Sequence, residues 1–229
     1  PSDLFRHSGN LNLNHRVNKW NIFGNAGFNT GENFNQTLLD RTASIGSTLT
    51  KFDQSFNRRQ NGTGYTGKVG AHYYASEKTV IGLMVDVGTI DNKLAGVSNS
   101  TINEYQQSAQ TLSFIQQNNG NKSKFNSITS NFNIKHDLAK KDPSLTFDLD
   151  YAGYGMDRNE NFDARYLDAS QNQTNVSNLR NIVDAKIDVF AAKTDFTWPF
   201  SKTLKFESGL KSSIVKTNND FVSEQLNNG

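Results

Sequence analysis

Apolar and polar residues alternate along several stretches of the chain, a pattern typical of β-strands that have one apolar and one polar face. In TDFTWPFSKTLKFESGLKSS, residues 194–213, the alternation stops at a short polar turn and then resumes. The same order of strand, lysine-containing turn and strand occurs four times, with turns around Lys19, Lys78, Lys140 and Lys202. These lysines are spaced 59, 62 and 62 residues apart, and the near-constant period predicts four hairpins, or about eight strands.

Long polar segments separate the hairpins, at residues 29–64, 98–124 and 155–181. We expect them to be long loops, parts of which, such as residues 36–52, extend the strands or fold briefly. Structureless loops of this length are uncommon in compact soluble domains. Short turns at one end and long loops at the other predict an all-β, antiparallel up-and-down meander, with residues 1–229 as a single segment of a transmembrane β-barrel.

The predicted strands differ in chemistry between their two faces. One face carries Ile81, Leu83, Val85 and Val87 in one strand and Leu145, Phe147, Leu149 and Tyr151 in another. The other face carries Thr146, Asp148 and Asp150, and Lys135 and Asp137 are expected within cross-strand reach of these aspartates. Lys186 and Asp188, which oppose Ile187 and Val189, are expected to continue the charged face. Such an apolar face must be covered by protein or lipid, whereas the charged face must meet water or opposite charge.

Aromatic residues gather at both ends of the predicted strands. Trp20, Tyr73, Tyr74, Trp198 and Phe200 fall at the short-turn end, and Phe28, Tyr65, Tyr151 and Tyr154 fall at the other end. Two aromatic girdles around an aliphatic band are typical of strands that cross a bilayer. Aromatic residues also favour strands in general, so the pattern fits strands outside a membrane as well.

Composition narrows the possible functions. The chain is 34% hydrophobic with a net charge of +2, and no basic cluster of the kind that binds nucleic acid stands out. It contains no cysteine, which excludes disulfides, thiolate metal sites and a cysteine nucleophile. No window of about 18 apolar residues predicts a transmembrane helix. The first ten residues, PSDLFRHSGN, lack the apolar core of a signal peptide.

Four patterns could carry chemistry, and each has a simpler structural interpretation. Gly62, Gly64 and Gly67 have the spacing of a phosphate-binding loop, but an alternating strand rather than a helix follows them. The segment Asp157–Asp168 has oxygen-bearing side chains at the spacing of a calcium loop, namely Asp157, Asn159, Asn161, Asp163 and Asp168. Phe162 stands where that loop needs glycine, so a solvated surface loop is the simpler interpretation.

The histidines and carboxylates form no recognisable catalytic pattern. The four histidines, His7, His15, His72 and His136, are scattered, and Asp148 and Asp150 fit ion pairing with Lys135 better than catalysis. Arginine and tyrosine residues in the polar segments, namely Arg58, Arg59, Arg158, Arg165, Tyr105, Tyr154 and Tyr166, are of types enriched in binding sites, but they also serve solubility. We therefore predict no catalytic residue, no metal site and no cofactor, and the sequence identifies no ligand-binding residue.

Several segments resemble the barrel of outer-membrane proteins related to TonB-dependent receptors. They are residues 9–28, 72–87, 135–154, 185–213 and 216–221. The resemblance rests on the style of strand and turn and covers most of the chain from Gly9 to Phe221. It implies a barrel of about 22 strands around a plug domain. It also implies uptake of a scarce nutrient, powered through TonB, at the cell outer membrane.

The chain departs from that family in three respects: it shows no plug, no upstream segment for TonB and no terminal aromatic strand. About eight strands are roughly a third of such a barrel, so we expect a fragment whose partners are the bilayer, a plug domain, TonB and an unknown extracellular ligand. Two alternatives stay open. One is a soluble, secreted all-β module that binds a glycan or protein, and the other is a small self-contained outer-membrane barrel.

Overall fold

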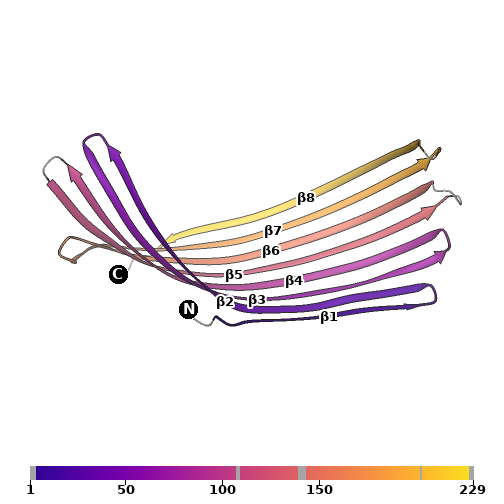
Figure 1. The fold of residues 1–229 in the computed structure, drawn as a ribbon, viewed down its shortest axis with the longest axis horizontal. Coiled ribbons are helices and arrows are strands. Elements are labelled where there is room, and N and C mark those ends of the chain that lie inside the picture. Colours follow the sequence, from indigo (N-terminus) through magenta and orange to yellow (C-terminus); the bar gives the residue numbers. More distant parts are fainter. Residues whose placement is uncertain (1–3, 107–108, 139–142, 202, 227–229) are drawn as a thin grey trace.

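The computed structural model describes residues 4–106, 109–138, 143–201 and 203–226. Eight strands follow one another along the chain. They are β1 (Arg6–Val17), β2 (Trp20–Ile45), β3 (Thr48–Ser76), β4 (Thr79–Gln106), β5 (Ala109–Asp137), β6 (Ser144–Leu167), β7 (Gln173–Pro199) and β8 (Lys205–Gln225). They form one antiparallel sheet in the order β1 to β8, so the predicted eight-stranded meander is confirmed (Figure 1).

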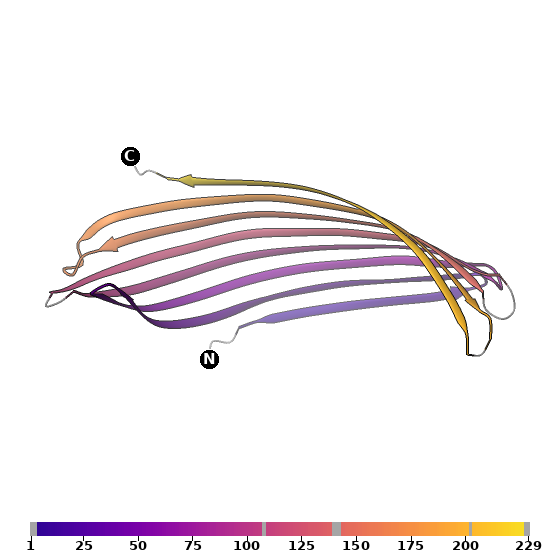
Figure 2. The same cartoon turned by 90° about the horizontal axis from the view of Figure 1, so that it is seen from above.

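The sheet is a single layer that curves along its strands and twists across them (Figures 1 and 2). It is not closed: among the described residues, β1 pairs only with β2, and β8 pairs only with β7. No second layer covers it, and the buried apolar side chains in the described part of the chain are Ala164 and Leu167. Stability of the described sheet therefore comes from its backbone ladders and from whatever surrounds its faces, not from a protein core.

Tight turns join the strands at both ends. Asn18 begins the two-residue β1–β2 turn with φ of 50°, and Gly46 takes φ of 60° between β2 and β3. Both values lie in the left-handed region, which Asn tolerates and Gly adopts freely. The predicted hairpin centres at Lys19 and Lys78 fall at turns, whereas Lys140 and Lys202 lie outside the described residues.

The prediction of three long loops is wrong, whereas the expectation that residues 36–52 extend the strands is confirmed. Residues 29–64 continue β2 and β3 around the turn at Gly46, and 155–181 continue β6 and β7 around a turn at 168–172. Likewise, 98–106 and 109–124 belong to β4 and β5. Polar side chains lie on both faces of these strand extensions, and exposed apolar residues such as Phe34, Leu39 and Val97 are scattered over both, so the alternation that identified the strands elsewhere is lost.

Residues that lie directly opposite each other on neighbouring strands have side chains on the same face. The cross-strand register therefore assigns every strand position to one of two faces. We call face A the side of Leu83 and face B the side of Met84, its neighbour in β4.

Gly46 provides a test of the β2–β3 turn. Gly46→Val is expected to destabilise the protein by about 1–2 kcal/mol, because a β-branched residue is strained in the left-handed region. Gly46→Asn is the matched control and is expected to cost much less, because Asn tolerates the left-handed region. A Cβ at this position meets no atom within 4 Å in either variant. Urea unfolding of vesicle-reconstituted protein measures the difference, and equal midpoints for the two variants would show that this segment is not a tight turn.

Candidate functional site

Face A carries an apolar band that runs across the sheet near the short-turn end. One cross-strand row of this band consists of Ile22, Ala71, Leu83, Phe132, Leu149, Ala192 and Ser212. No protein covers it in the described structure: Leu83 is 55% exposed and Val69, in the next row, is 59% exposed. A continuous apolar surface of this kind requires a non-aqueous neighbour.

Aromatic side chains mark both edges of the band. At the short-turn edge Trp20 packs on Tyr73 with ring centroids 4.6 Å apart, and Trp198 stacks on Phe200 at 5.5 Å. At the opposite edge Phe28 lies directly across from Tyr65. Farther along this edge, Tyr151 packs on Phe190 with ring centroids 4.8 Å apart. Both aromatic belts therefore lie on face A.

The two edges are parallel to each other and oblique to the rows of the sheet. The row of Phe28 reaches β7 at Lys186, four residues beyond the edge residue Phe190. The row of Trp20 reaches β7 at Thr194, four residues before Trp198. The offset between row and edge therefore has the same size and direction at both edges.

This offset gives the tilt of the strands against the band. Four residues along a strand are about 13 Å and five strand spacings are about 24 Å, which corresponds to a tilt of about 30°. Trp20 and Phe28 are eight residues apart, as are Phe190 and Trp198. At that tilt, eight residues span a height of about 23 Å, close to the apolar band of outer-membrane barrels of about 25 Å.

Two residues predicted for the girdles lie elsewhere. Tyr74 and Tyr154 lie on face B. Tyr74 directly follows the face A residue Tyr73, and Tyr154 lies three residues after the face A residue Tyr151. There Arg16 lies over the Tyr74 ring at 4.6 Å, and Tyr154 stacks on Phe125 at 6.1 Å. The sequence showed aromatic clusters at the correct ends of the strands but not the face of each ring.

Behind the apolar band, face B is polar and carries charges of both signs. The ion pairs there are Lys68–Asp86 at 3.3 Å, Lys135–Asp137 at 3.5 Å, Lys193–Asp195 at 2.5 Å and Lys205–Glu207. Most of these side chains are around half exposed, so each pair contributes little to the free energy of unfolding. The charges instead make this face compatible with water.

The predicted pairing of Lys135 with the β6 aspartates takes a different form. The Lys135 ammonium contacts Asp137 of its own strand, while Asn131 donates a 2.7 Å hydrogen bond to Asp150. Asp148 lies directly across from Lys193. Asp150 thus has a structural hydrogen-bond partner, and Asp148 faces a lysine across the polar side of the sheet.

Lys186 and Asp188 do not continue the charged face as predicted; they lie on face A. An odd number of residues separates them from Lys193 and Asp195, so they project to the other side of β7. Both lie beyond the Phe190 edge of the band, and the Tyr151 hydroxyl donates a 2.8 Å hydrogen bond to Asp188. Face A therefore changes from apolar to charged at this edge.

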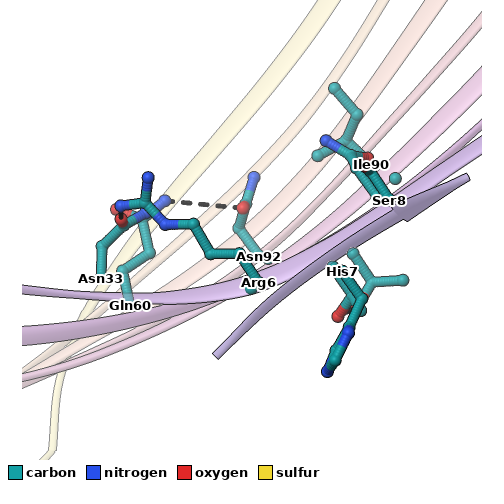
Figure 3. Close-up of a pocket in the computed structure, with 13 residues that line it drawn as sticks. Arg6, His7, Ser8, Asn33, Gln60, Ile90 and Asn92 are labelled. Carbon is teal, nitrogen blue, oxygen red and sulfur yellow. Dashed lines mark hydrogen bonds between the residues drawn. The ribbon is translucent and has the colours of Figure 1, made fainter. Parts of the chain in front are cut away.

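A polar hollow lies on face B, just beyond the edge marked by Phe28 and Tyr65 (Figure 3). One cross-strand row forms its floor and ends: Arg6, Gly31, Gly62 and Asn92. Asn33 and Gln60 add a wall, and the cavity volume is about 380 Å³. In Figure 3 the side chains of Arg6, Asn33, Gln60 and Asn92 lie on one side of the sheet, and His7 points to the other.

Hydrogen bonds between side chains shape this hollow. Arg6 donates to the Asn33 side-chain oxygen, and Gln60 donates to Asn92 at 3.5 Å. A Cβ on Gly62 would lie 2.7 Å from the Asn92 side-chain oxygen, so glycine is what allows Asn92 to lie over the floor. One arginine and several amides suit a polar solute with hydroxyl or anionic groups.

The glycines at Gly62, Gly64 and Gly67 lie inside β3, with no helix after them. They therefore lack the helix N-terminus that a phosphate-binding loop requires. Sequence reasoning found these glycines but missed the hollow. The residues that line the hollow come from four strands. Neighbouring residues in its row lie about 25 to 30 positions apart in the sequence, and only the cross-strand register brings them together.

The segment Asp157–Asp168 is not a cation-binding loop. Residues 157–167 belong to strand β6. Four of the predicted ligands lie at successive face A positions of this strand instead of surrounding a cation: Asp157, Asn159, Asn161 and Asp163. Asp168 begins the following turn and accepts 2.9 Å hydrogen bonds from the backbone N–H groups of Ser170 and Asn172. Within the described residues, no three His, Asp or Glu side chains come together as a metal site.

The four histidines are dispersed over the sheet. His72 packs against Phe23 on face B at 5.2 Å, and His136 shares a 2.8 Å hydrogen bond with Thr79. His7 and His15 lie on the edge strand β1. No helix in the described part of the chain is long and apolar enough to cross a membrane.

Comparison with known proteins agrees with the fold. Residues 136–229 match the outer membrane protein beta-barrel family. The fold is that of an outer-membrane β-barrel segment, and the protein is located in the cell outer membrane. No curated protein matches the sequence.

Similar solved structures are distant. The ferric yersiniabactin uptake receptor FyuA from Yersinia pestis is 10% identical over 96% of this chain and 38% of its own, with a TM-score of 0.37. The siderophore receptor PiuA from Acinetobacter baumannii is 8% identical over 93% of this chain and 44% of its own, with a TM-score of 0.22. CarO from Acinetobacter baumannii is 8% identical over 68% and 77% of the two chains, with a TM-score of 0.16. The chain spans less than half the length of the two receptors.

Leu83 and Met84 provide a direct test of the two faces. Leu83→Arg is expected to lower the free energy of unfolding in vesicles by about 2–4 kcal/mol, the cost of a basic residue on a lipid face near the bilayer midplane. Met84→Arg places the same side chain one residue away on face B and is expected to cost far less. Equal destabilisation in urea titrations would contradict the assignment of face A to lipid.

Asp168 provides a pH test outside the band. Hydrogen bonding from the Asn172 backbone N–H, above all, lowers the pKa of Asp168 below its usual value of 3.8. The stabilisation of the turn is therefore complete above that value and is lost as the pH falls through the lowered pKa. Hydrogen exchange at the Asn172 amide is expected to be slow at neutral pH and to lose its protection in that acid range. Asp168→Asn is the control that removes the titration, and a protection profile that depends on pH equally in both proteins would contradict this assignment.

Proposed function

We propose that this chain is part of the barrel of an outer-membrane receptor or transporter that is not an enzyme. The observation that carries the proposal is the aromatic-bounded apolar band on face A, backed by a hydrated, charged face B. In a barrel, face A meets lipid and face B lines the lumen. An apolar band of this height would be unfavourable if it were exposed to water.

The open edges support a larger barrel. The outer edges of β1 and β8 carry unpaired backbone groups in the described sheet, although both strands cross the level of the band. Unpaired N–H and C=O groups in the hydrocarbon layer each cost several kcal/mol. We propose that further strands pair with both edges, and that energy coupling through TonB and a plug domain belong to the complete protein.

The hollow of Arg6, Asn33, Gln60 and Asn92 supports a role in solute capture. With face B toward the lumen, it lies near the outer mouth of the barrel, where an arriving polar solute meets the wall. The polar side chains of the hollow can bind such a solute through hydrogen bonds. The substrate we propose is a scarce polar nutrient bound on its way inward.

The two alternatives are less well supported. A soluble binding module would pack face A against a second sheet, and the described residues form one sheet only. A small self-contained barrel would pair β1 with β8, which lie on opposite edges of the described sheet (Figure 1).

Uptake measurements test the proposal. Cells lacking the gene are expected to lose uptake of one member of a panel of metal chelates, vitamins and oligosaccharides. Wild-type cells are expected to lose the same uptake when an uncoupler collapses the proton gradient. Uptake that persists with the uncoupler would indicate passive diffusion instead, and unchanged uptake of every solute would contradict a transport role.

A further inference from the structure

Face B of strands β1, β2 and β3 carries basic side chains and no acidic ones. The register places five cations on this face, which we call the basic strip: Arg6, Arg16, Arg41, Arg58 and Lys68. The acidic residues of the same three strands, Glu32, Asp40 and Asp53, all project to face A. The two faces of this part of the sheet therefore differ in the sign of their charge.

The rest of face B does not neutralise the basic strip. Strands β4 to β8 carry more carboxylates than lysine and arginine side chains on this face, but most of them lie several strands away. The nearest are Asp86 and Glu104 in β4, and Asp86 pairs with Lys68 at 3.3 Å. Among the described residues, none of the four arginines has a carboxylate oxygen within 4 Å.

Two arginines of the basic strip are held in place by aromatic rings instead of carboxylates. The guanidinium carbon of Arg16 lies 4.6 Å from the centroid of the Tyr74 ring, and that of Arg41 lies 4.5 Å from the centroid of Phe52. A ring below a guanidinium fixes its position without using its N–H donors. Those donors therefore stay available for a carboxylate or phosphate, which a guanidinium binds in bidentate geometry.

Two hollows lie along the basic strip. The first is the hollow at Arg6 described above. The second has a cavity volume of about 330 Å³, and its face B residues are Asn12, Asn14, Phe23, Asn25 and Lys68. In β2, Asn25 lies six residues before Gly31, which is opposite Arg6, so the hollows are about 20 Å apart along the strands. Each hollow combines a cation with amide side chains.

The basic strip runs along the strands and not across them. Its levels, given as the β2 position in the same cross-strand row, are 21 for Arg16, 25 for Lys68, 31 for Arg6, 35 for Arg58 and 41 for Arg41. Successive cations are therefore about 13 to 20 Å apart, and the whole strip is about 66 Å long. It extends from the short-turn end of the sheet, past the Phe28 edge of the band, into the region beyond.

We propose that the basic strip binds an anionic solute and is the wall along which that solute moves through the lumen. The arginines bind its carboxylate or phosphate groups, first at the hollow of Arg6 and then toward the hollow beside Lys68. The excess of carboxylates on β4 to β8 keeps the solute on this wall. The inference rests on the proposed function, because it requires face B to line the lumen, and it narrows the substrate to an acidic one.

Single cysteines measure the sign of the potential at the basic strip, because the chain contains no native cysteine. Ser8→Cys and Asn12→Cys place one thiol in each hollow of the full-length protein in vesicles. Anionic sulfonatoethyl methanethiosulfonate is expected to react at both positions about tenfold faster than the cationic trimethylammonium analogue, with rates normalised to a free thiol. Thr129→Cys is the control on face B of β5, across from Asp86, and is expected to show no preference for the anionic reagent.

Arg58 and Arg59 are neighbours in β3 on opposite faces and give a matched pair of variants. Arg6→Gln/Arg58→Gln is expected to remove most of the preference at position 8. Arg59→Gln, which removes a face A cation paired with Glu32 at 2.9 Å, is expected to leave it unchanged. The preference is also expected to weaken as salt screens the exposed charges. Heat-modifiable gel migration reports the folding of every variant.

Competition at position 8 identifies the anionic group. Tricarballylate and trimetaphosphate are compared with sodium chloride at the same ionic strength. Slower modification in tricarballylate assigns the site to carboxylates, slower modification in trimetaphosphate assigns it to phosphates, and slowing by both assigns it to either group. Modification that neither compound slows would overturn anion binding at the hollow of Arg6.

Equal rates for the two reagents at positions 8 and 12, or a preference for the cationic one, would overturn the proposal. That result is expected if an acidic surface of a plug domain covers the basic strip. Loss of uptake of an uncharged nutrient in cells lacking the gene would overturn the acidic substrate but leave transport intact. Unchanged uptake of every solute would contradict the proposed function, and the reagent preference would then still establish the strip as an anion-binding surface.

Discussion

The structure depends on one constraint: a single-layer sheet with an uncovered apolar band must satisfy all its backbone groups within the sheet and find a non-aqueous neighbour for that band. Within the band, the ladders from β1 to β8 satisfy the backbone of the six inner strands on both sides. They leave the outer edges of β1 and β8 open, and water does not reach those edges inside a hydrocarbon layer. The bilayer covers the apolar band, and the further strands that we propose would cover the edges.

The same constraint explains why the chemistry of face A changes along each strand. Within the band, face A is apolar and only face B is charged. Beyond the Phe28 and Phe190 edge, charged residues such as Asp188, Lys93 and Lys122 lie on face A as well, among scattered apolar residues. Strands β2 to β7 have 24–29 residues, about three times the eight residues that cross the band, so they extend well beyond it as a sheet with polar residues on both faces. The polar hollow on face B lies in this extended part of the sheet.

Sequence analysis predicted the strands wherever one face is apolar. The alternation around Ile81–Val87 and the turns at Lys19 and Lys78 were sufficient, because period-two patterning and turn residues are local properties. It failed over 29–64 and 155–181, because a strand that is hydrated on both faces has the composition of a loop. The turn at Gly46 is a single glycine within a polar stretch and gave no separate indication.

The sites were harder to predict than the strands. Lys186 and Asp188 were assigned to the wrong face because β7 is one continuous strand in which polar residues change sides at the edge of the band. The hollow on face B combines side chains from four strands, and only the cross-strand register brings Arg6 close to Asn92. No local motif encodes such a register.

A cysteine scan of β4 tests the assignment of face A to lipid most directly, because the chain contains no native cysteine. Single cysteines at positions 81 to 87, spin-labelled in reconstituted vesicles, report collisions with oxygen, which concentrates in lipid, and with a water-soluble nickel chelate. The account predicts high oxygen accessibility at the odd positions and high nickel accessibility at the even ones. Odd positions that are shielded from both reagents would show that protein, not lipid, covers face A, and would contradict it.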